Sequence, residues 1–241
     1  MKYGLIGKNI QYSLSPKLHV AAYKQEHMDA TYELLDIAEE DLPNIMEQVK
    51  TMNGVNITVP YKTAVLEYID ELDAHAEEIG AVNTIQVEDG KLVGYNTDWL
   101  GVLKPLQERT TLEGKTAIVF GAGGAARAAV YALLHAGADV HIINRTEEKA
   151  AALAEHFNCT YGTFPLTAGG DILVNTIPID NNIPHFDIVF DMRYDPPRTK
   201  LLQQAEQQGA TIIKGTEMLA TQAAEAFYIW TGKRVHLEGV L

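Results

Sequence analysis

Short runs of apolar and β-branched residues alternate along the chain with stretches whose apolar positions recur at helical spacing. In the N-terminal part, such runs predict strands over Lys2 to Ile6, Thr31 to Asp36, Gly54 to Ile57 and Ala81 to Val87. Helical patterns begin at Pro16 and Glu39, and Glu88-Asp89-Gly90 predicts the turn of a hairpin. Because hairpins join antiparallel strands and helical crossovers join parallel ones, we expect a mixed sheet covered by helices.

From Thr116 the alternation becomes stricter. The predicted strands are Thr116 to Phe120, Asp139 to Ile143, Asp171 to Asn175, Ile188 to Phe190 and Thr211 to Ile213. A helix runs to His135, another begins at Glu147, and an amphipathic helix spans Glu217 to Trp230. Since parallel strands need such crossovers, this pattern predicts a doubly wound, Rossmann-like parallel sheet.

The two patterns together predict an α/β protein of two domains. We expect the first, with the mixed sheet, over residues 1–102, and the Rossmann-like domain over residues 103–216. For the final segment, residues 217–241, the pattern leaves two positions open: the crevice, or a return onto the first domain.

Composition narrows the possible partners. The formal net charge of −13 repels polyanions, so we expect a small-molecule substrate and neither nucleic acid nor a membrane as partner. Cys159 is the only cysteine and the histidines lack metal-ligand spacing, so we expect no disulfide and no metal. Without a secretory pattern at Met1, the cytoplasm is the expected compartment. A monomer and a homodimer both remain open.

A glycine-rich run follows the strand that ends at Phe120. Gly121-Ala122-Gly123-Gly124-Ala125-Ala126 fits G-x-G-x-x-G/A directly before an alanine-rich helix. Gly121 permits a tight turn, Gly123 lets backbone approach a pyrophosphate, and Ala126 allows close packing of helix on strand. The alternative is a tight turn without a ligand, but the strand–loop–helix context favours nucleotide binding.

The segment after the second Rossmann strand indicates which dinucleotide is bound. An NAD site usually carries Asp or Glu at this place, whereas this chain has Asn144-Arg145-Thr146, with Lys149 nearby. Positive charge without a carboxylate suits the 2′-phosphate of NADP. Alternatively, Thr146 only caps a helix and Arg145 is a solvated surface charge.

Several N-terminal residues are candidates for substrate binding, although each has a structural alternative. Ser15 suits the N-cap of the helix at Pro16, and the same helix end, with Ser13, would suit a carboxylate. Thr58 and Lys62 follow a strand that breaks at Pro60, where the sheet opens. Read alone, Lys62 is a solvated lysine.

Three further polar residues have similar alternatives. Asp98 read alone is a helix cap, and His19 is interpreted as a packed or capping histidine. Gln222 lies within the apolar stripe of the closing helix, so its amide either bonds protein backbone or reaches a hydroxylated ligand.

In combination, these motifs resemble the shikimate dehydrogenase family. Ser13-Leu14-Ser15-Pro16 is similar to its substrate-carboxylate loop. The runs similar to its N-[VI]-T-x-P-x-K, A-V-N-T and N-T-D motifs are Asn56-Ile57-Thr58-Val59-Pro60-Tyr61-Lys62, Ala81-Val82-Asn83-Thr84 and Asn96-Thr97-Asp98. The resemblance covers nearly the whole chain, and its specificity lies in the order of the separate motifs.

The resemblance implies NADPH-dependent, reversible reduction of 3-dehydroshikimate to shikimate in aromatic amino acid (chorismate) biosynthesis. It gives Lys62 and Asp98 the catalytic positions. Substrate contacts would be made by Ser13, Ser15, Thr58, Lys62, Asn83, Asp98, Tyr194 and Gln222. Cofactor contacts would be made by Gly121, Ala122, Gly123, Gly124, Ala125, Asn144, Arg145, Thr146 and Lys149, with Met192 and Gly215 beside the nicotinamide. We hypothesise that Asp98 orients charged Lys62, which protonates the nascent alkoxide.

One loop departs from the family pattern, and other functions compete. Where the family often has N-A-T-P-x-G-M, this chain has Asn175-Thr176-Ile177-Pro178-Ile179-Asp180, so the cofactor contacts of that loop are open. The competing functions are a quinate/shikimate dehydrogenase of the same family, a methylene-tetrahydrofolate dehydrogenase and a catalytically inactive NADP-binding module. Intact Lys62 and Asp98 argue against the inactive module.

Overall fold

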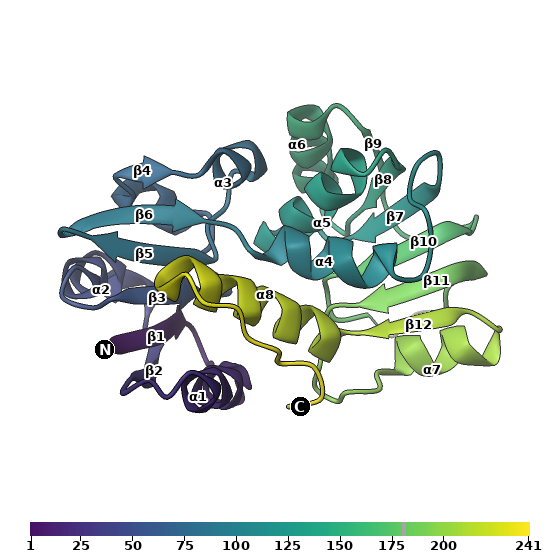
Figure 1. The fold of residues 1–241 in the computed structure, drawn as a ribbon. Helices are drawn as coiled ribbons and strands as arrows, with labels where there is room; N and C mark the ends of the chain where they lie inside the picture. Colours follow the sequence, from purple (N-terminus) through teal and green to yellow (C-terminus); the bar gives the residue numbers. More distant parts are fainter. Residues whose placement is uncertain (180–181) are drawn as a thin grey trace. The chain divides into compact units, whose positions relative to one another are not determined.

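The computed structural model describes residues 1–179 and 182–241 and divides into two compact units. The first unit comprises Met1–Asp98 and Leu219–Leu241, and the second comprises Trp99–Met218. The chain passes between them at the start of α4 (Asp98–Gln107) and within α8 (Gly215–Thr231) (Figure 1). Both catalytic candidates, Lys62 and Asp98, therefore belong to the first unit.

The first unit contains a six-stranded mixed sheet with strand order β2-β1-β3-β5-β6-β4. Its strands are β1 (Lys2–Gly7), β2 (Thr31–Asp36), β3 (Gly54–Ile57), β4 (Glu71–Leu72), β5 (Thr84–Glu88) and β6 (Lys91–Tyr95). β1 runs parallel to β2 and β3, whereas β3 and β5 pair antiparallel. β5 and β6 form the expected hairpin, which turns at Asp89 and Gly90. The predicted mixed sheet is confirmed.

The helices of the first unit differ from the predicted ones in detail. They are α1 (Ser15–Gln25), the 3-10 helix η1 (Glu39–Asp41), α2 (Leu42–Val49), the 3-10 helix η2 (Ala64–Tyr68), α3 (Ala74–Ile79) and the later part of α8. The helix expected from Glu39 is split because Pro43 occupies one of the first positions of α2, where proline starts a helix well. The strand expected from Ala81 begins only at Thr84, so Asn83 lies just before β5.

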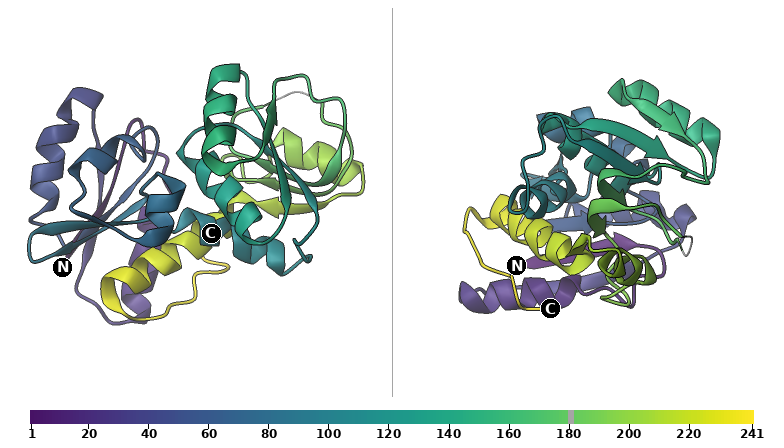
Figure 2. Two further views of the ribbon diagram at one scale, coloured as in Figure 1. Left: turned by 90° about the horizontal axis from the view of Figure 1, so that it is seen from above. Right: turned by 90° about the vertical axis from the view of Figure 1, so that its right-hand side faces the viewer.

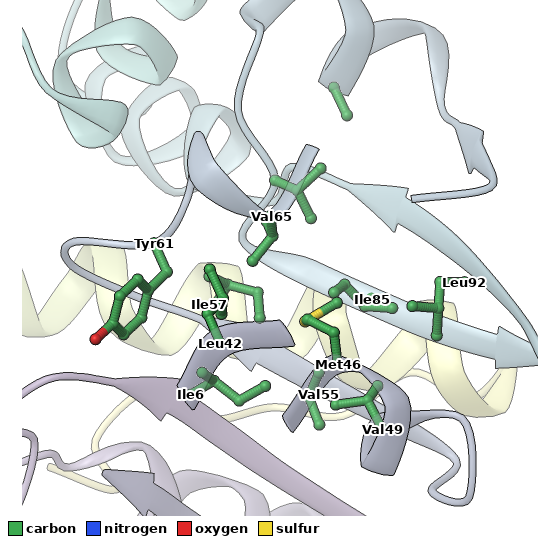
Figure 3. Close-up of a cluster of buried hydrophobic side chains, with 12 residues drawn as sticks. Ile6, Leu42, Met46, Val49, Val55, Ile57, Tyr61, Val65, Ile85 and Leu92 are labelled. Carbon is green, nitrogen blue, oxygen red and sulfur yellow. The ribbon is translucent and has the colours of Figure 1, made fainter. Parts of the chain in front are cut away.

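A hydrophobic core holds the sheet and helices of the first unit together. Figure 3 shows its side chains, which are Ile6, Leu42, Met46, Val49, Val55, Ile57, Tyr61, Val65, Ala76, Val82, Ile85 and Leu92. The final helix joins this unit through Trp230, whose indole Nε1 donates to Ile85 O at 3.0 Å. A Cβ atom at Gly54 would lie 2.4 Å from the same Nε1, so glycine permits this close approach of α8 to β3.

The second unit contains a six-stranded, entirely parallel sheet with order β12-β11-β10-β7-β8-β9. The strands are β7 (Thr116–Phe120), β8 (Asp139–Ile143), β9 (Thr160–Gly162), β10 (Gly170–Asn175), β11 (Phe186–Asp191) and β12 (Thr211–Lys214). Helices α5 (Gly124–His135), α6 (Glu147–Phe157) and α7 (Lys200–Gln207) connect β7 to β8, β8 to β9 and β11 to β12. Helices α5 and α7 lie on opposite sides of the sheet (Figure 2). The predicted Rossmann-like sheet is confirmed.

The strand order reverses between β7 and β10. The chain adds β8 and β9 on one side of β7, and then adds β10, β11 and β12 on the other side. In open α/β sheets a ligand binds at the carboxyl ends of the strands beside such a reversal. The glycine run and the start of the atypical loop both lie at this place. Among residues 1–179 and 182–241, no helix has the length and apolar character needed to span a membrane.

Candidate functional site

Lys62 and Asp98 form an ion pair in the first unit. Lys62 Nζ donates to Asp98 Oδ2 at 2.5 Å, and 12% of the lysine side chain and 3% of the aspartate side chain are exposed. Lys62 lies in the loop after β3, and its carbonyl oxygen accepts from Val82 N at 2.8 Å. The interpretation of Lys62 as a solvated surface lysine is therefore wrong.

Asp98 begins α4, but its carboxylate does not cap that helix end. The Asn96 side chain serves there instead: its Oδ1 accepts from Asp98 N at 3.0 Å, and its Nδ2 donates to Ala81 O at 2.8 Å. The Asp98 carboxylate is left to bind side chains, with Oδ2 facing Lys62 and Oδ1 accepting from Asn83 Nδ2 at 2.7 Å. The interpretation of Asp98 as a helix cap is corrected accordingly.

Asn83 connects this pair to the final helix. Besides Asp98, its Nδ2 atom lies 3.0 Å from Thr97 Oγ1 and 3.4 Å from Gln222 Oε1. Gln222 is 6% exposed and donates through Nε2 to Leu219 O at 2.9 Å. One end of its amide thus bonds backbone, while the other faces Asn83. Lys62, Asp98, Asn83 and Gln222 form one cluster.

The two serines lie at the start of α1, where the expected capping is shifted by one residue. Leu14 occupies the N-cap position and Ser15 is the first helical residue, so the assignment of Ser15 as N-cap is wrong. The reason is that Ser13 provides the bond, since its Oγ accepts from Ser15 N at 3.2 Å. Ser15 is 5% exposed. Burial also raises the pKa of the nearby Tyr32 phenol, which donates a hydrogen bond to Asn56 Oδ1.

Thr58 follows β3 and lies beside the end of β1. Its backbone N donates to Ile6 O at 2.9 Å, and its Cγ2 atom lies 2.5 Å from where a Cβ atom of Gly7 would be. The structure describes no hydrogen bond between the Thr58 hydroxyl and the Lys62–Asp98 pair. Thr58 therefore shares the carboxyl edge of β1 and β3 with the loop that carries Lys62.

His19 is a packed histidine, as interpreted from the sequence. It is fully buried and stacks on Tyr32 with ring centroids 4.3 Å apart, beside Tyr23 and Trp230. Among the described residues, neither ring nitrogen has a hydrogen-bond partner. Burial lowers the pKa of His19 to about 3, so the ring is neutral near pH 7.

This neutral histidine makes stability depend on pH. Because its folded-state pKa lies below the ordinary value of 6.5, the unfolded chain takes up the proton first as the pH falls. Between pH 7 and pH 4.5 we expect the wild type to lose about 2 to 3 kcal/mol more free energy of unfolding than His19→Phe. Urea denaturation of both proteins at the two pH values measures this difference. Equal losses would show that His19 is not buried in its neutral form.

In the second unit, the glycine run forms a tight turn at the end of β7. Gly121 has φ +113°, which side chains rarely adopt, and its N donates to Ile143 O at 2.9 Å. Gly123 is the N-cap of α5 and provides no side-chain cap, and a Cβ atom there would meet nothing within 4 Å. The run thus presents open backbone at the N-terminus of a twelve-residue helix, an arrangement suited to a pyrophosphate.

The segment Asn144-Arg145-Thr146 follows β8 directly. Asn144 Nδ2 donates to Thr146 O at 2.9 Å and closes the turn, while Arg145 and Lys149 are exposed. Thr146 is the N-cap residue of α6, but its side chain makes no capping hydrogen bond. The expected N-cap position is confirmed and the expected capping bond is absent. The hydroxyl is thereby left for another acceptor or donor.

Met192 and Gly215 lie against each other in the second unit. A Cβ atom at Gly215 would lie 2.4 Å from Met192 O and 2.5 Å from Arg193 O, so only glycine allows this approach. Met192 follows β11, and Tyr194 lies two residues further along the same loop. Of the predicted substrate residues, Tyr194 is the one that belongs to the second unit.

The atypical loop is attached to the glycine run. Thr176 Oγ1 donates to Phe120 O at 2.7 Å, and Asn175 Nδ2 donates to Ile177 O at 2.8 Å and to Asp191 Oδ1 at 2.9 Å. Asp191 is fully buried, and burial raises its pKa although Thr199, Arg193 and Asn175 donate hydrogen bonds to it. Asp180, the last residue of the atypical loop, lies outside the described residues.

Models of protein families match most of this chain. The substrate binding domain of shikimate dehydrogenase matches residues 5–85, the model described as shikimate / quinate 5-dehydrogenase matches 105–177, and the shikimate 5′-dehydrogenase C-terminal domain matches 215–240. The chain belongs to the shikimate dehydrogenase family. The predicted resemblance is therefore confirmed.

Named relatives agree with the family models. A shikimate dehydrogenase (NADP(+)) of Methanothermobacter thermautotrophicus is 41% identical, and the match covers 95% of this chain and 90% of the relative. One from Natronomonas pharaonis is also 41% identical, with 98% and 95% covered. Among solved structures, shikimate 5-dehydrogenase of Thermus thermophilus, in complex with NADP(H) and shikimate, has a TM-score of 0.92 and 35% identity. That match covers 100% of this chain and 97% of the other.

Four residues of the shikimate dehydrogenase motifs, to which the sequence assigned no role, support the site. Asn56, Thr84 and Thr97 are buried and hydrogen-bonded around Asn83, and Asn96 holds the start of α4. The sequence already indicated these residues, because each is a small polar residue beside a predicted site residue within a motif. What the pattern could not supply was which donor faces which acceptor.

Proposed function

We propose that this chain is an NADP-dependent shikimate dehydrogenase, which reversibly reduces 3-dehydroshikimate to shikimate. The observation that carries the proposal is the partly buried Lys62–Asp98 pair joined to Asn83 and Gln222, in a member of this family. Such a cluster combines one proton donor with amide and carboxylate groups suited to a polyhydroxylated ring. The product feeds the biosynthesis of chorismate and the aromatic amino acids.

The cofactor site in the second unit fits NADP. Gly121 is in a left-handed conformation, the N-terminus of α5 carries no side-chain cap, and exposed Arg145 and Lys149 follow β8 without a carboxylate. Arg145 would pair with the 2′-phosphate, and the helix end would hold the pyrophosphate. Met192 and Gly215 would lie beside the nicotinamide ring, which supplies the hydride when it is bound.

The residues of the first unit handle the proton. When the ring ketone is reduced, hydride adds to the carbonyl carbon and the carbonyl oxygen takes a proton from Lys62 Nζ. Asp98 orients Lys62 through the bond at 2.5 Å and balances its charge before the transfer. In the reverse direction, Lys62 accepts the proton of the substrate hydroxyl. Ser13, Ser15, Thr58, Asn83 and Gln222 would hold the carboxylate and the remaining hydroxyls.

Gly121 offers a test of the cofactor site. A Cβ atom at Gly121 would lie 2.3 Å from Thr176 Oγ1 and 2.8 Å from Ile177 Cγ2. For Gly121→Ala we expect NADPH affinity to fall at least about tenfold, because the turn must shift away from the pyrophosphate. The matched control is Gly114→Ala, which also has a positive φ, +70°, but meets nothing within 4 Å. Fluorescence titration with NADPH gives the affinities of both variants. Similar NADPH affinities of Gly121→Ala and Gly114→Ala would contradict the proposed pyrophosphate site at the Gly121 turn.

The reaction itself is tested by offering the purified protein shikimate and quinate separately, each with NADP and with NAD, while NAD(P)H absorbance is followed. We expect turnover of shikimate with NADP and little with the other three combinations. Turnover of quinate or use of NAD would assign the broader quinate/shikimate activity. No change in NAD(P)H absorbance in any of the four combinations, together with tight NADP binding, would instead support an inactive binding module.

Membership of the shikimate dehydrogenase family removes methylene-tetrahydrofolate dehydrogenase from the competing functions. Every residue with a role in the proposal comes from one chain, so a monomer and a homodimer are both compatible with it. We infer a cytoplasmic location because the reaction draws on NADPH.

A further inference from the structure

A chain of hydrogen bonds lies behind the Lys62–Asp98 pair, and all its donors point toward the carboxylate. Tyr32 OH donates to Asn56 Oδ1 at 2.7 Å, and Asn56 Nδ2 donates to Thr84 Oγ1 at 3.0 Å. Thr84 Oγ1 in turn donates to Asn83 Oδ1 at 3.0 Å. Asn83 Nδ2 completes the chain at Asp98 Oδ1, 2.7 Å away.

The direction of these bonds follows from the donors available. The Tyr32 hydroxyl donates to the oxygen of the Asn56 amide, so the NH2 group of that amide faces Thr84. The threonine oxygen accepts from this NH2 group, and its single hydrogen is left to donate to Asn83 Oδ1. Asn83 Oδ1 also accepts from Thr97 N at 2.7 Å. Both bonds require the oxygen of the Asn83 amide on that side, and the nitrogen therefore faces Asp98.

The residues of this hydrogen-bond chain are buried, so the proposed site depends on the orientation of the Asn83 amide. Asn56 is 5% exposed, Asn83 2% and Thr84 0%, so water cannot replace a missing bond cheaply. An Asn83 amide turned by half a rotation would place its oxygen against the Asp98 carboxylate, where two acceptors repel each other. Aligned donors also polarise one another and strengthen the final bond to the carboxylate.

We propose that Thr84 and Asn56 are positioning residues, which lock the Asn83 amide with its nitrogen on Asp98 and thereby hold the carboxylate in place for Lys62. This inference rests on the proposed function for its catalytic consequence. Tyr32 is the outermost donor of the chain and acts through Asn56. None of the three needs to touch the substrate for this role.

The test compares Thr84→Val, which removes the hydroxyl but nearly keeps the shape, with Thr84→Ser, which keeps the hydroxyl. For Thr84→Val we expect kcat/KM for 3-dehydroshikimate to fall about tenfold or more, with the Kd for NADPH within about twofold of wild type. Thr84→Ser should stay within about threefold of wild type, and Tyr32→Phe should give a smaller loss than Thr84→Val. Equal losses in the valine and serine variants would overturn the proposal, since packing and not the hydroxyl would then be responsible.

A second measurement does not depend on turnover. In 15N-labelled protein, the side-chain amide signals of Asn83 are identified by their disappearance in Asn83→Asp. We expect these signals to shift and their hydrogens to exchange faster in Thr84→Val, and to stay close to wild type in Thr84→Ser. Unchanged Asn83 signals in Thr84→Val would overturn the proposal. An inactive wild type would contradict the proposed function, while the amide signals would still decide whether Thr84 orients Asn83.

Discussion

Replacing Lys62 with alanine is expected to lower kcat by about 10²- to 10⁴-fold, the usual contribution of a positioned general acid. The NADPH Kd should stay within about twofold of wild type, because the residues proposed to bind the dinucleotide belong to the second unit. Steady-state kinetics with 3-dehydroshikimate and a fluorescence titration with NADPH measure the two quantities. Unchanged kcat, or normal kcat with a large rise in the NADPH Kd, would contradict the role given to Lys62.

Two further variants separate proton transfer from the loss of a charge. Removing one partner of a buried ion pair costs about 3–5 kcal/mol of stability, so Lys62→Ala requires a check of its melting temperature. Lys62→Arg keeps the positive charge beside Asp98 but is a far weaker proton donor, and we expect it to be nearly as inactive as the alanine variant. Lys91→Ala, whose exposed lysine pairs with Glu71, is the control and should keep wild-type activity.

Arg145→Ala should weaken NADPH binding by about 10- to 100-fold and leave NADH binding within about twofold of wild type. The reason is that only NADPH has the 2′-phosphate that Arg145 would bind. Fluorescence titration of the wild type and of Arg145→Ala with each reduced dinucleotide gives the four dissociation constants. Lys149→Ala should show the same preference with a smaller loss, because a flexible ammonium replaces the planar guanidinium as the lost partner.

An equal loss of affinity for NADPH and NADH would overturn the selectivity assigned to Arg145. Arg198→Ala provides a matched control, because this exposed arginine pairs with Glu206 on α7. Both dinucleotides should bind that variant as they bind the wild type.

The regular elements could be predicted from the sequence because each is specified locally. The bounds predicted for β2, β3, β7 and β8 match the structure, because each is a short run that contains β-branched or aromatic residues. Short pieces were missed: β4 has two residues and β9 three, too few to show alternation. Both are edge strands, each paired with a single neighbouring strand, and neither is long enough to have a recognisable sequence pattern of its own.

Hydrogen-bond partners in the site could not be predicted in the same way. Lys62 and Asp98 are 36 residues apart and Asn83 and Gln222 are 139 apart, so no local spacing relates them. Sequence reasoning alone gave a solvated lysine and a helix cap, and only the family resemblance made them a pair. The fold brings them together because the loop after β3, the residues before β5 and the start of α4 meet in the first unit.

The most direct test of the proposed function is the rate at which NADPH absorbance falls after 3-dehydroshikimate is added to the purified protein. We expect rapid, enzyme-dependent oxidation of NADPH with shikimate formed in equal amount, and a much slower rate with NADH. Absence of oxidation in folded protein that binds NADPH would contradict the assignment of this chain as a shikimate dehydrogenase.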